Sequence, residues 1–549
     1  MNKLMRRIFP LLIALAFLAG CGTEDNYNGY EHTQDTVDDW TLEITTGNMR
    51  IQGNPGIIPG VFFTDARIPA FIGGGAYPRL YALANGTVLL GFDIGRPGHT
   101  TAVMVSSSTD MENWTDPVVA AAYDDLWAAN LTFIQLENGD VMGFYRANDS
   151  LANEPRRDGY YSSIRAIISR DNGQSWAFHS IVTEEVGIGG VYEPHPIKIN
   201  GQVAVFYAND SRNVVNQHME QNIEFRIWDG ESWSETFIAS DGIATASRDG
   251  MSVLDRCIDG GYVMVIEATN VPGHPFVVQM TASPDGLDWS APMRNIFVPH
   301  QRGRRASAPY IVTLPDGRFA VSFQTDQGRV MTGDARSIMK VMFSKDTRGY
   351  EWTEAFIPFL VPEDSTAVWT SLFLWGNRLF AAAGSNHPRG GIYLREAFVT
   401  PHTPVGHNTI SNGMFMFGNF DNWYFLMNNH YFRYDRFPRA QFPARAGNFF
   451  VQLDNHTANN IYLNQQIPGV AAGEYTFSIR AFGGAEVAVV ISQGNERVDF
   501  TFNTPPGETF TEITVPGIQL ADGVAHISIA MLGGTGEALA LDDVRLVRQ

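Results

Sequence analysis

The chain has 549 residues, of which 44% are hydrophobic and 17% charged, and its formal net charge is −20 at pH 7. This composition is typical of a globular protein rather than a disordered one, and the length predicts two or three domains. The negative charge argues against nucleic acid or another polyanion as a partner and suits a neutral substrate. The 53 glycines and 36 phenylalanines favour β-sheets joined by tight turns.

The first 21 residues have the organisation of a secretion signal. A basic flank precedes an apolar run at 8–17, which is too short for a mature membrane span. The "LAGC" that follows resembles a bacterial lipobox, which implies cleavage before Cys21 and a diacylglycerol on its sulfur. A plain signal peptide is the alternative. Residues 22–48 are polar and acidic and predict a flexible tether, so we expect a secreted bacterial lipoprotein at the cell surface or in the periplasm, with membrane contact through the lipid anchor only.

A turn motif recurs six times along the next 300 residues or so. Each copy has a turn glycine followed by an apolar strand, as in "LANGTVLLGF" at 83–92 and "LPDGRFAVSF" at 314–323. Asn-Gly and Asp-Gly between strands predict hairpins, because both residue types tolerate positive φ. The turn glycines are 53 to 62 residues apart: Gly86, Gly139, Gly201, Gly260, Gly317 and Gly376. Units of this length hold four short strands each, so residues 49–400 predict a six-bladed β-propeller, with a solenoid as the alternative.

A second motif follows five of the six hairpins, with its tryptophan 28 to 37 residues after the glycine. Full copies are "SRDNGQSW" at 169–176, "TASPDGLDW" at 281–289 and "SKDTRGYEW" at 344–352, and degraded copies lie at 106–114 and 228–233. The Asp and Ser side chains can bond local backbone N–H groups, the Gly permits a tight reversal, and the Trp can pack between sheets. We interpret the motif as a structural staple and not as a catalytic element.

The strands before the turn glycines should line the propeller channel, yet they carry charged and aromatic side chains. Buried carboxylates and guanidiniums are unfavourable unless they are paired or hydrated, so their concentration at one end of six strands predicts a polar pocket. We assign "DARIPA", with Asp65 and Arg67, to the start of blade one, and Asp93 to the strand after its hairpin. The other candidate binding residues are Arg79, Trp127, Asn130, Tyr192, Arg248, Asp249, Tyr310 and Trp369.

Two glutamates in neighbouring blades stand out. Glu193 lies in the channel strand of blade three, and Glu267 ends the apolar strand "YVMVIE" of blade four. Glycoside hydrolysis needs one carboxyl group to protonate the leaving oxygen and a second to attack the anomeric carbon or to activate water. The alternative is that each glutamate forms a salt bridge at the end of its strand.

The propeller segments resemble known carbohydrate-active families. The Asp-box turns, "ARIP" and "GTVLLGFDIGR" resemble the sialidase superfamily, whereas "YPRLYALANGT", "YEPHP", "SRDGMSVLDRCIDGGYVMVIEATN" and "SAPYIVTLPDGRFAVSFQTD" are most similar to glycoside hydrolase family 93. Members of family 93 are exo-1,5-α-L-arabinanases that release arabinobiose with retention. The resemblance covers about residues 49–400 and implies that Glu193 is the nucleophile and Glu267 the acid/base. It also implies sugar contacts from Arg79, Asp249, Tyr310 and Trp369, with Trp127 stacking on a sugar, and it implies no divalent metal.

Two other functions remain open at this point. A sialidase needs three arginines and a tyrosine nucleophile paired with a glutamate. Arg67, Arg248 and Arg305 are candidates for the arginines, although "ARIP" lacks the usual aromatic residue before its arginine. A non-catalytic glycan-binding propeller would keep the aromatic residues and lack a close carboxyl pair.

Residues 401–410 predict a linker, and 411–549 predict a β-sandwich with alternating strands such as "GEYTFSIRAF". The segments "ISNGMFMFGNFDNWYF" and "GEALALDDVRLV" resemble carbohydrate-binding jelly rolls of the galactose-binding type. We expect a monomer that binds an oligo- or polysaccharide, with no cofactor except a possible structural Ca²⁺ at Asp542 and Asp543. Cys257 should be a small buried hydrophobe. Four aromatic residues of this domain either stack on polysaccharide or belong to its core: Trp423, Tyr424, Tyr431 and Tyr434.

Overall fold

The computed structural model describes residues 61–549 with gaps, and in strands next to some gaps it describes the backbone only. The predicted signal, Cys21 and the tether therefore lie outside the described residues. The two helices of the described part have four and three residues, and neither has the length or the apolar character to cross a membrane. The gaps are 68–74, 96–100, 150–159, 188, 212–219, 360, 362–363, 387–390, 401–404, 407, 411–422, 427–430, 437–448, 455–460, 508–509 and 533–537.

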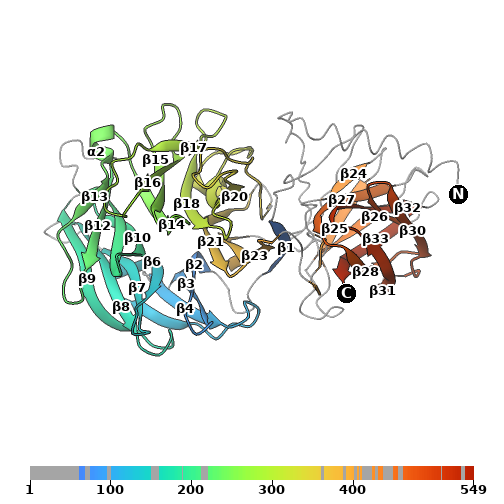
Figure 1. The fold of residues 1–549 in the computed structure, drawn as a ribbon, viewed down its shortest axis with the longest axis horizontal. Coiled ribbons are helices and arrows are strands. Elements are labelled where there is room, and N and C mark those ends of the chain that lie inside the picture. The colour runs from blue at the N-terminus through green and yellow to red at the C-terminus, as the bar shows by residue number, and fades with distance from the viewer. Residues whose placement is uncertain are drawn as a thin grey trace. The chain divides into compact units, whose positions relative to one another are not determined.

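Six antiparallel sheets form a closed ring, which confirms the predicted propeller (Figure 1). The innermost strand of every blade contacts the innermost strands of both neighbouring blades, and the last of them contacts the first. Blade one comprises β2 (Gly75–Ala82), β3 (Val88–Gly95), β4 (Thr101–Ser108) and β5 (Val118–Ala122). Blade two comprises β6 (Leu126–Gln135), β7 (Val141–Asp149), β8 (Tyr160–Ser169) and β9 (Ala177–Gly187). Blade three comprises β10 (Val191–Ile199), β11 (Gln202–Asn209), β12 (Asn222–Trp228) and β13 (Phe237–Ser240).

The other three blades differ in how they are completed. Blade four comprises β14 (Gly250–Arg256), β15 (Tyr262–Ala268), β16 (Val277–Ser283) and β17 (Arg294–Phe297). Blade five has β18 (Ala306–Thr313), β19 (Phe319–Thr325) and β20 (Ile338–Phe343), with an isolated bridge from Val341 to Phe356 on its outer side. Blade six has β21 (Ala367–Trp375), β22 (Arg378–Ser385), β23 (Gly391–Phe398) and, as its outer strand, β1 (Phe62–Arg67).

The position of β1 corrects one expectation from the sequence. Asp65 and Arg67 do not begin blade one, because β1 pairs with β23 and completes blade six, with Arg67 opposite Leu394. A strand from the beginning of the ring thus joins strands from its end, so that the hydrogen bonds of one sheet close the circle.

The predicted hairpins and staples are both present. All six turn glycines have φ between 62° and 94°. In "SRDNGQSW" the Ser169 hydroxyl donates to Asp171 (2.7 Å), the Gly173 N–H donates to Ser169 Oγ (2.8 Å), and the Trp176 indole donates to the Gly173 carbonyl (3.1 Å). Trp176 packs in a core that also contains Leu89 of blade one. The motif of blade two therefore fixes its own turn and packs it against the preceding blade.

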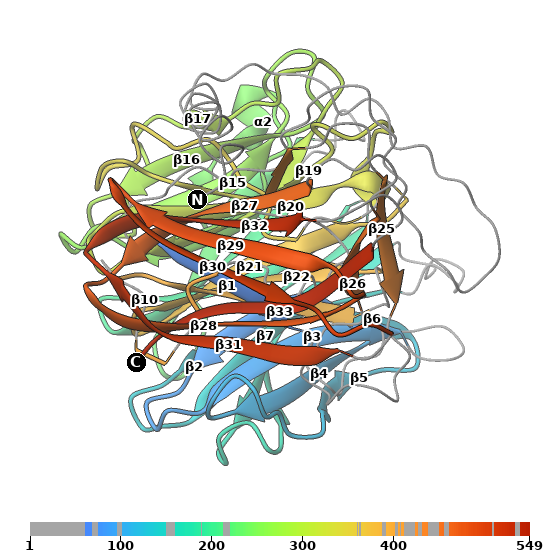
Figure 2. The ribbon, with the colours of Figure 1, turned by 90° about the vertical axis from the view of Figure 1, so that its right-hand side faces the viewer.

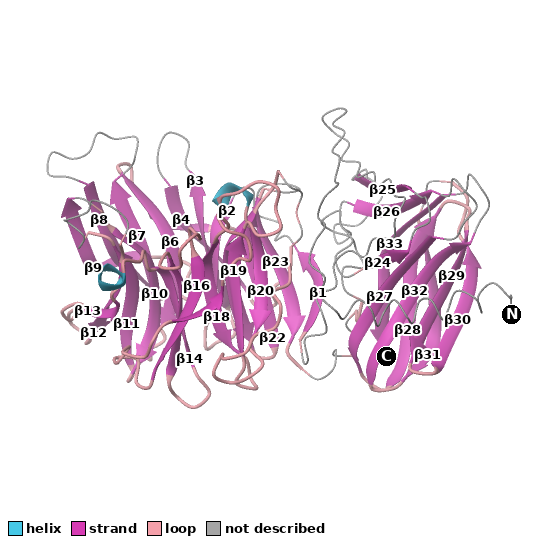
Figure 3. Ribbon diagram, turned by 90° about the horizontal axis from the view of Figure 1, so that it is seen from above, coloured by secondary structure: helices cyan, strands magenta, loops and turns pink. Residues whose placement is uncertain are grey.

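The C-terminal domain is a β-sandwich of two five-stranded antiparallel sheets (Figures 2 and 3). Trp423 is fully buried in its core with Tyr475 and Ile529, so this tryptophan is a core residue and offers no surface for stacking. Asn408 pairs with Val547 and Ile410 enters the same core, although both lie in the predicted linker. One sheet comprises β24 (Tyr424–Leu426), β27 (Ile461–Val470), β32 (Gly523–Leu532), β29 (Glu486–Gln493) and β30 (Glu496–Asn503); the other comprises β25 (Tyr431–Arg436), β26 (Phe449–Asp454), β33 (Ala538–Arg548), β28 (Gly473–Phe482) and β31 (Thr511–Leu520).

Substitution of Gly173 tests the staple. Gly173 and Gly139 have nearly equal φ values of 89° and 91°, but an added Cβ would lie 2.7 Å from buried Leu89 only at Gly173. We expect Gly139→Ala to lower propeller stability by about 1 kcal/mol through backbone strain. Gly173→Ala should lose about 1–3 kcal/mol more, because the packed core cannot absorb the methyl group. Urea unfolding of both variants measures the difference in their free energies of unfolding. Equal losses of stability would contradict the packing of the staple turn against Leu89.

Candidate active site

A β-bulge recurs in the inner strand of every blade. The register with the second strand shifts at the same point of each blade, and one residue there has a φ between 47° and 64°. Such a conformation costs a non-glycine residue about 1–3 kcal/mol, so the surrounding sheet must impose it. The six bulge residues lie seven to nine residues before the turn glycines: Tyr77, Asn130, Glu193, Met251, Ala308 and Trp369.

The second strand of each blade supplies a matching position, which we call the second-strand position. It is the register partner of the residue just before the bulge and lies seven or eight residues after the turn glycine. The six residues are Asp93, Arg146, Ala208, Glu267, Gln324 and Gly384. In three blades this side chain accepts a hydrogen bond from the bulge N–H of the next blade, from Asn130 to Asp93, from Ala308 to Glu267 and from Trp369 to Gln324.

Glu267 is held in place from two sides. Its Oε2 accepts the Ala308 N–H at 2.8 Å, and a Cβ on its register partner Gly250 would lie 2.9 Å from Oε1. The side chain is only 6% exposed. Burial raises the pKa of Glu267 to about 7, and the negative charge of Glu193 contributes to the rise. Near neutral pH, Glu267 therefore holds a proton in about half of the molecules.

Glu193 occupies the bulge of blade three, next to the blade that carries Glu267. Burial raises its pKa, while the guanidiniums of Arg146, Arg248 and Arg79 act in the opposite direction. Arg248 acts in the same way on Glu267, so its charge influences both carboxyl groups. The two carboxyl groups thus differ in their surroundings: one has three guanidiniums near it, and the other is buried beside a like charge.

The side chain of Arg79 is buried and does not lie on the surface of the site. It is 4% exposed, and its Nη1 donates to the carbonyls of Pro78 (2.8 Å) and Thr370 (3.2 Å). Its guanidinium carbon lies 3.7 Å from the ring centre of Tyr77 and 5.2 Å from that of Tyr310. Arg79 and Tyr310 therefore pack against each other. Arg79 influences the pKa of Glu193 through its charge.

The aromatic bulge residues differ in exposure. Tyr77 is buried and packs with Met251 and Ala308 at the bulge level. Trp369 is 37% exposed, and its ring centre lies 6.3 Å from that of Tyr77. An exposed indole beside the site can stack on the apolar face of a sugar.

The structure brings most of the predicted residues together but not all of them. Tyr192 precedes Glu193 and lies 5.7 Å from the guanidinium of Arg146. Asp249, in contrast, is 2% exposed and accepts the Ser240 hydroxyl at 2.6 Å, on the side of blade three's outer strand. Trp127 pairs with Asn148, three residues before the bulge of its strand, and so does not occupy a bulge position.

Three charged residues that act on the two glutamates were not predicted from the sequence: Arg146, Asp210 and Asp334. Arg146 occupies a second-strand position, and counting seven residues from the turn glycine in each repeat would have found it. Asp210 lies 3.8 Å from Arg248, and Asp334 forms a 2.5 Å ion pair with Arg305. Both acids lie outside the strands, because Asp210 directly follows β11 and Asp334 belongs to a three-residue 3₁₀-helix between β19 and β20.

These ion pairs also bear on the arginines considered for a sialidase. Arg305 is paired with Asp334, Arg248 lies beside Asp210, and Arg67 belongs to the outer strand of blade six. The guanidiniums of Arg79, Arg146 and Arg248 act on Glu193, and Arg248 is one of the three considered for a sialidase.

Residues 96–358 match the BNR repeat-like domain. This match confirms the resemblance of the Asp-box turns to the sialidase superfamily. No curated protein matches the chain significantly. The glycoside hydrolase family 93 α-L-arabinofuranosidase of Fusarium graminearum with arabinobiose is 17% identical, with 62% of this chain and 97% of that one covered and a TM-score of 0.46. The Penicillium chrysogenum α-L-arabinanase with arabinobiose is 17% identical, with 61% of this chain and 98% of that one covered and a TM-score of 0.47. The NanB sialidase of Streptococcus pneumoniae is 12% identical, with 60% of this chain and 69% of that one covered and a TM-score of 0.43.

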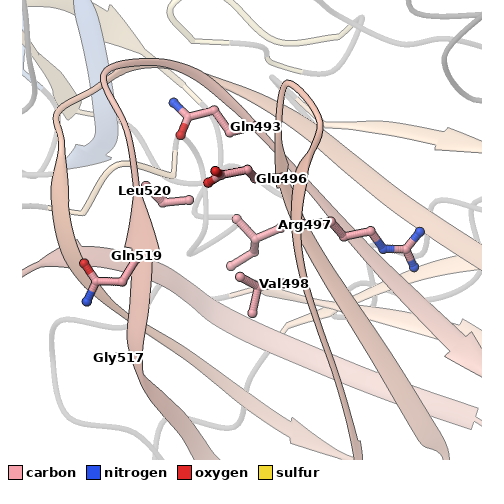
Figure 4. Close-up of a pocket in the computed structure, with 8 residues that line it drawn as sticks. Gln493, Glu496, Arg497, Val498, Gly517, Gln519 and Leu520 are labelled. Carbon is pink, nitrogen blue, oxygen red and sulfur yellow. The ribbon is translucent and has the colours of Figure 1, made fainter.

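Outside the BNR repeat-like domain, a pocket of about 440 Å³ opens between the sandwich strands β30 and β31 (Figure 4). Its polar side chains are engaged: Gln493 donates to and accepts from the Ala521 backbone, and Gln519 donates to Glu474. The side chain of Arg497 points away from Glu496 in Figure 4 and pairs with Asp499. The pocket lacks a carboxyl pair like that of the propeller, so the propeller is the candidate for chemistry.

The remaining sequence expectations concern metals and Cys257. Asp543 pairs with Arg545 at 2.7 Å, and the described residues contain no group of three or more His, Cys, Asp or Glu side chains placed to hold a metal ion. The calcium site at Asp542 and Asp543 stays a prediction. Cys257 is half-buried beside the core between blades four and five, and burial raises the pKa of its thiol to about 11.

The electrostatic link between the two glutamates can be tested directly. In Glu193→Gln the like charge near Glu267 is lost, so the pKa of Glu267 should fall from about 7 toward the ordinary value. Asp334→Asn, which removes a weaker contribution of the same sign, should produce a smaller decrease. Carboxyl titration by ¹³C NMR or difference infrared spectroscopy measures both. An unchanged pKa in Glu193→Gln would mean that the carboxyl groups do not share a site.

Proposed function

We propose that the chain is a retaining glycoside hydrolase that cleaves α-L-arabinan or a related plant polysaccharide. The observation that carries this proposal is the pair of carboxyl groups on adjacent blades, with Glu267 buried and Glu193 partly buried, one of which raises the pKa of the other. Buried ionisable groups reduce the stability of a protein, so their presence at one site indicates a function that needs them. A glycan-binding protein does not need such a pair.

In the proposed mechanism the two glutamates have separate roles. The protonated carboxyl group of Glu267 donates its proton to the glycosidic oxygen while Glu193 attacks the anomeric carbon, so the C–O bond to the leaving group breaks as the bond to Glu193 forms. Glu267, now ionised, takes a proton from water, which displaces Glu193 from the sugar. Arg146 and Arg248 stabilise the ionised form of Glu193, and the Ala308 N–H orients Glu267.

The arabinan substrate rests on narrower support. The segments around both glutamates, "YEPHP" and "VIEATN", are those most similar to family 93. The exposed Trp369 and the partly buried Tyr192 offer sugar-binding surfaces beside the glutamates. The lipid at Cys21 would hold the enzyme at the cell envelope, and the sandwich would bind the polysaccharide.

Incubation with linear α-1,5-arabinan tests the activity. We expect release of arabinobiose, with retained configuration in the first product seen by NMR. Glu193→Gln and Glu267→Gln should each lower kcat by about 10²–10⁴-fold, because each removes one step of the proton or bond transfer. Glu137→Gln, in an exposed hairpin turn, is the matched control and should retain full activity. Release of sialate from a sialyl glycoside would identify a sialidase, and no release from either substrate would favour a glycan-binding protein.

The pH profile of kcat/KM should be bell-shaped. Activity should fall above about pH 7, because Glu267 must carry a proton and its pKa is about 7. It should also fall on the acid side at a pH above 4.5, because burial raises the pKa of Glu193 above that ordinary value. With an aryl glycoside whose leaving group needs no proton, Glu267→Gln should lose the alkaline limb only. Activity that rises through pH 8 would contradict the assignment of Glu267 as the acid.

A further inference from the structure

A third carboxylate at the site has no role in the mechanism above. Asp93 occupies the second-strand position of blade one, which is the position of Glu267 in blade four. Its oxygens accept the Asn130 N–H at 3.0 and 3.1 Å, just as Glu267 accepts the Ala308 N–H. Asp93 is partly exposed, so its remaining lone pairs can reach a ligand.

Arg146 occupies the second-strand position of the next blade. Its positive charge acts on both Asp93 and Glu193, so the guanidinium lies near both carboxylates. Its Nε is buried and has no hydrogen-bond partner in the described part of the chain, although the residue itself is partly exposed. A buried donor left without a partner is unfavourable, so this N–H is available for a ligand.

The charges around this pair point to the class of sugar. A sugar hydroxyl both donates and accepts a hydrogen bond, so it can donate to Asp93 and accept from Arg146. A carboxylate on the sugar could accept from Arg146 but would also meet the carboxyl groups of Asp93 and Glu193, which repel it when they are ionised. Burial raises the pKa of Asp93 to about 7, so the repulsion from Asp93 increases above that pH. Arg79 is buried and bonded to backbone carbonyls, and Arg305 is paired with Asp334, so a sugar carboxylate would depend on Arg146 and Arg248 for its hydrogen bonds.

We propose that Asp93 and Arg146 together bind hydroxyl groups of the sugar that Glu193 attacks, and that this pair restricts the enzyme to neutral sugars at that position. The proposal rests on the glycosidase function proposed above. It assigns Asp93 and Arg146 to substrate binding, and it uses a donor and an acceptor that the fold brings together at equivalent positions of adjacent blades.

Steady-state kinetics of Asp93→Asn and Arg146→Met test the proposal with a neutral arabinoside. Each variant should raise KM by roughly 10- to 100-fold, as expected for loss of a hydrogen bond to a charged group, with a smaller change in kcat. Arg146→Lys should recover part of the loss, because it keeps the charge but not the planar fork. Asp316→Asn and Arg170→Met change exposed charges in turns at the strand ends away from the bulges and should leave KM unchanged.

The outcomes separate this proposal from the function itself. If the wild-type enzyme hydrolyses the arabinoside and KM stays unchanged in Asp93→Asn and Arg146→Met, the sugar-binding role is wrong while the glycosidase remains. A wild-type preference for a sialoside or a uronide over the neutral arabinoside would overturn the neutral-sugar specificity. Asp93→Asn should increase kcat/KM for an aryl uronide relative to the neutral arabinoside, and a decrease would contradict the charge argument. Absence of hydrolysis of every glycoside would overturn the function and, with it, this proposal.

Discussion

The candidate site depends on one backbone feature, a residue held at positive φ in the inner strand of each blade. At these bulges the backbone N–H turns toward the neighbouring blade, where it donates to Asp93, Glu267 or Gln324. A hydrogen bond of this kind fixes the side chain of one blade with the backbone of the next. The closed ring imposes the strained conformation, and the strain in turn determines where the functional side chains lie.

The same scaffold gives chemically different residues at equivalent positions. The six second-strand residues are an aspartate, an arginine, an alanine, a glutamate, a glutamine and a glycine, although their backbone environments match. The small residues leave space, and the charged ones gather around Glu193. Burial raises the pKa of both carboxyl groups, but the charge of Glu193 adds to the rise at Glu267, whereas three arginines oppose the rise at Glu193. This division is the one that acid catalysis with a carboxylate nucleophile requires.

Much of the fold follows from the sequence because repetition reveals it. Six evenly spaced turn glycines give the number of blades, and the Ser, Asp, Gly and Trp of each staple give their turns. The closure by β1 could not be predicted, because nothing local in "FFTDAR" distinguishes the last strand of one blade from the first of another. Glu193 was predicted from its place in a channel strand and Glu267 from its place at the end of an apolar strand. Arg146 was missed because the second strands were not aligned by counting from their turn glycines, which places Arg146 at the position of Glu267. Asp249 lies one residue before β14, and its side chain accepts a hydrogen bond from Ser240.

Trapping the covalent intermediate tests the central claim most directly. A slowly hydrolysed arabinofuranoside with fluorine at C2 should accumulate on the nucleophile, and mass spectrometry of the digested protein should locate the sugar on Glu193. In Glu193→Gln the label should be absent, while Glu267→Gln should still acquire it from a reagent with a good leaving group. A label on a tyrosine, or on any acid other than Glu193, would contradict the account.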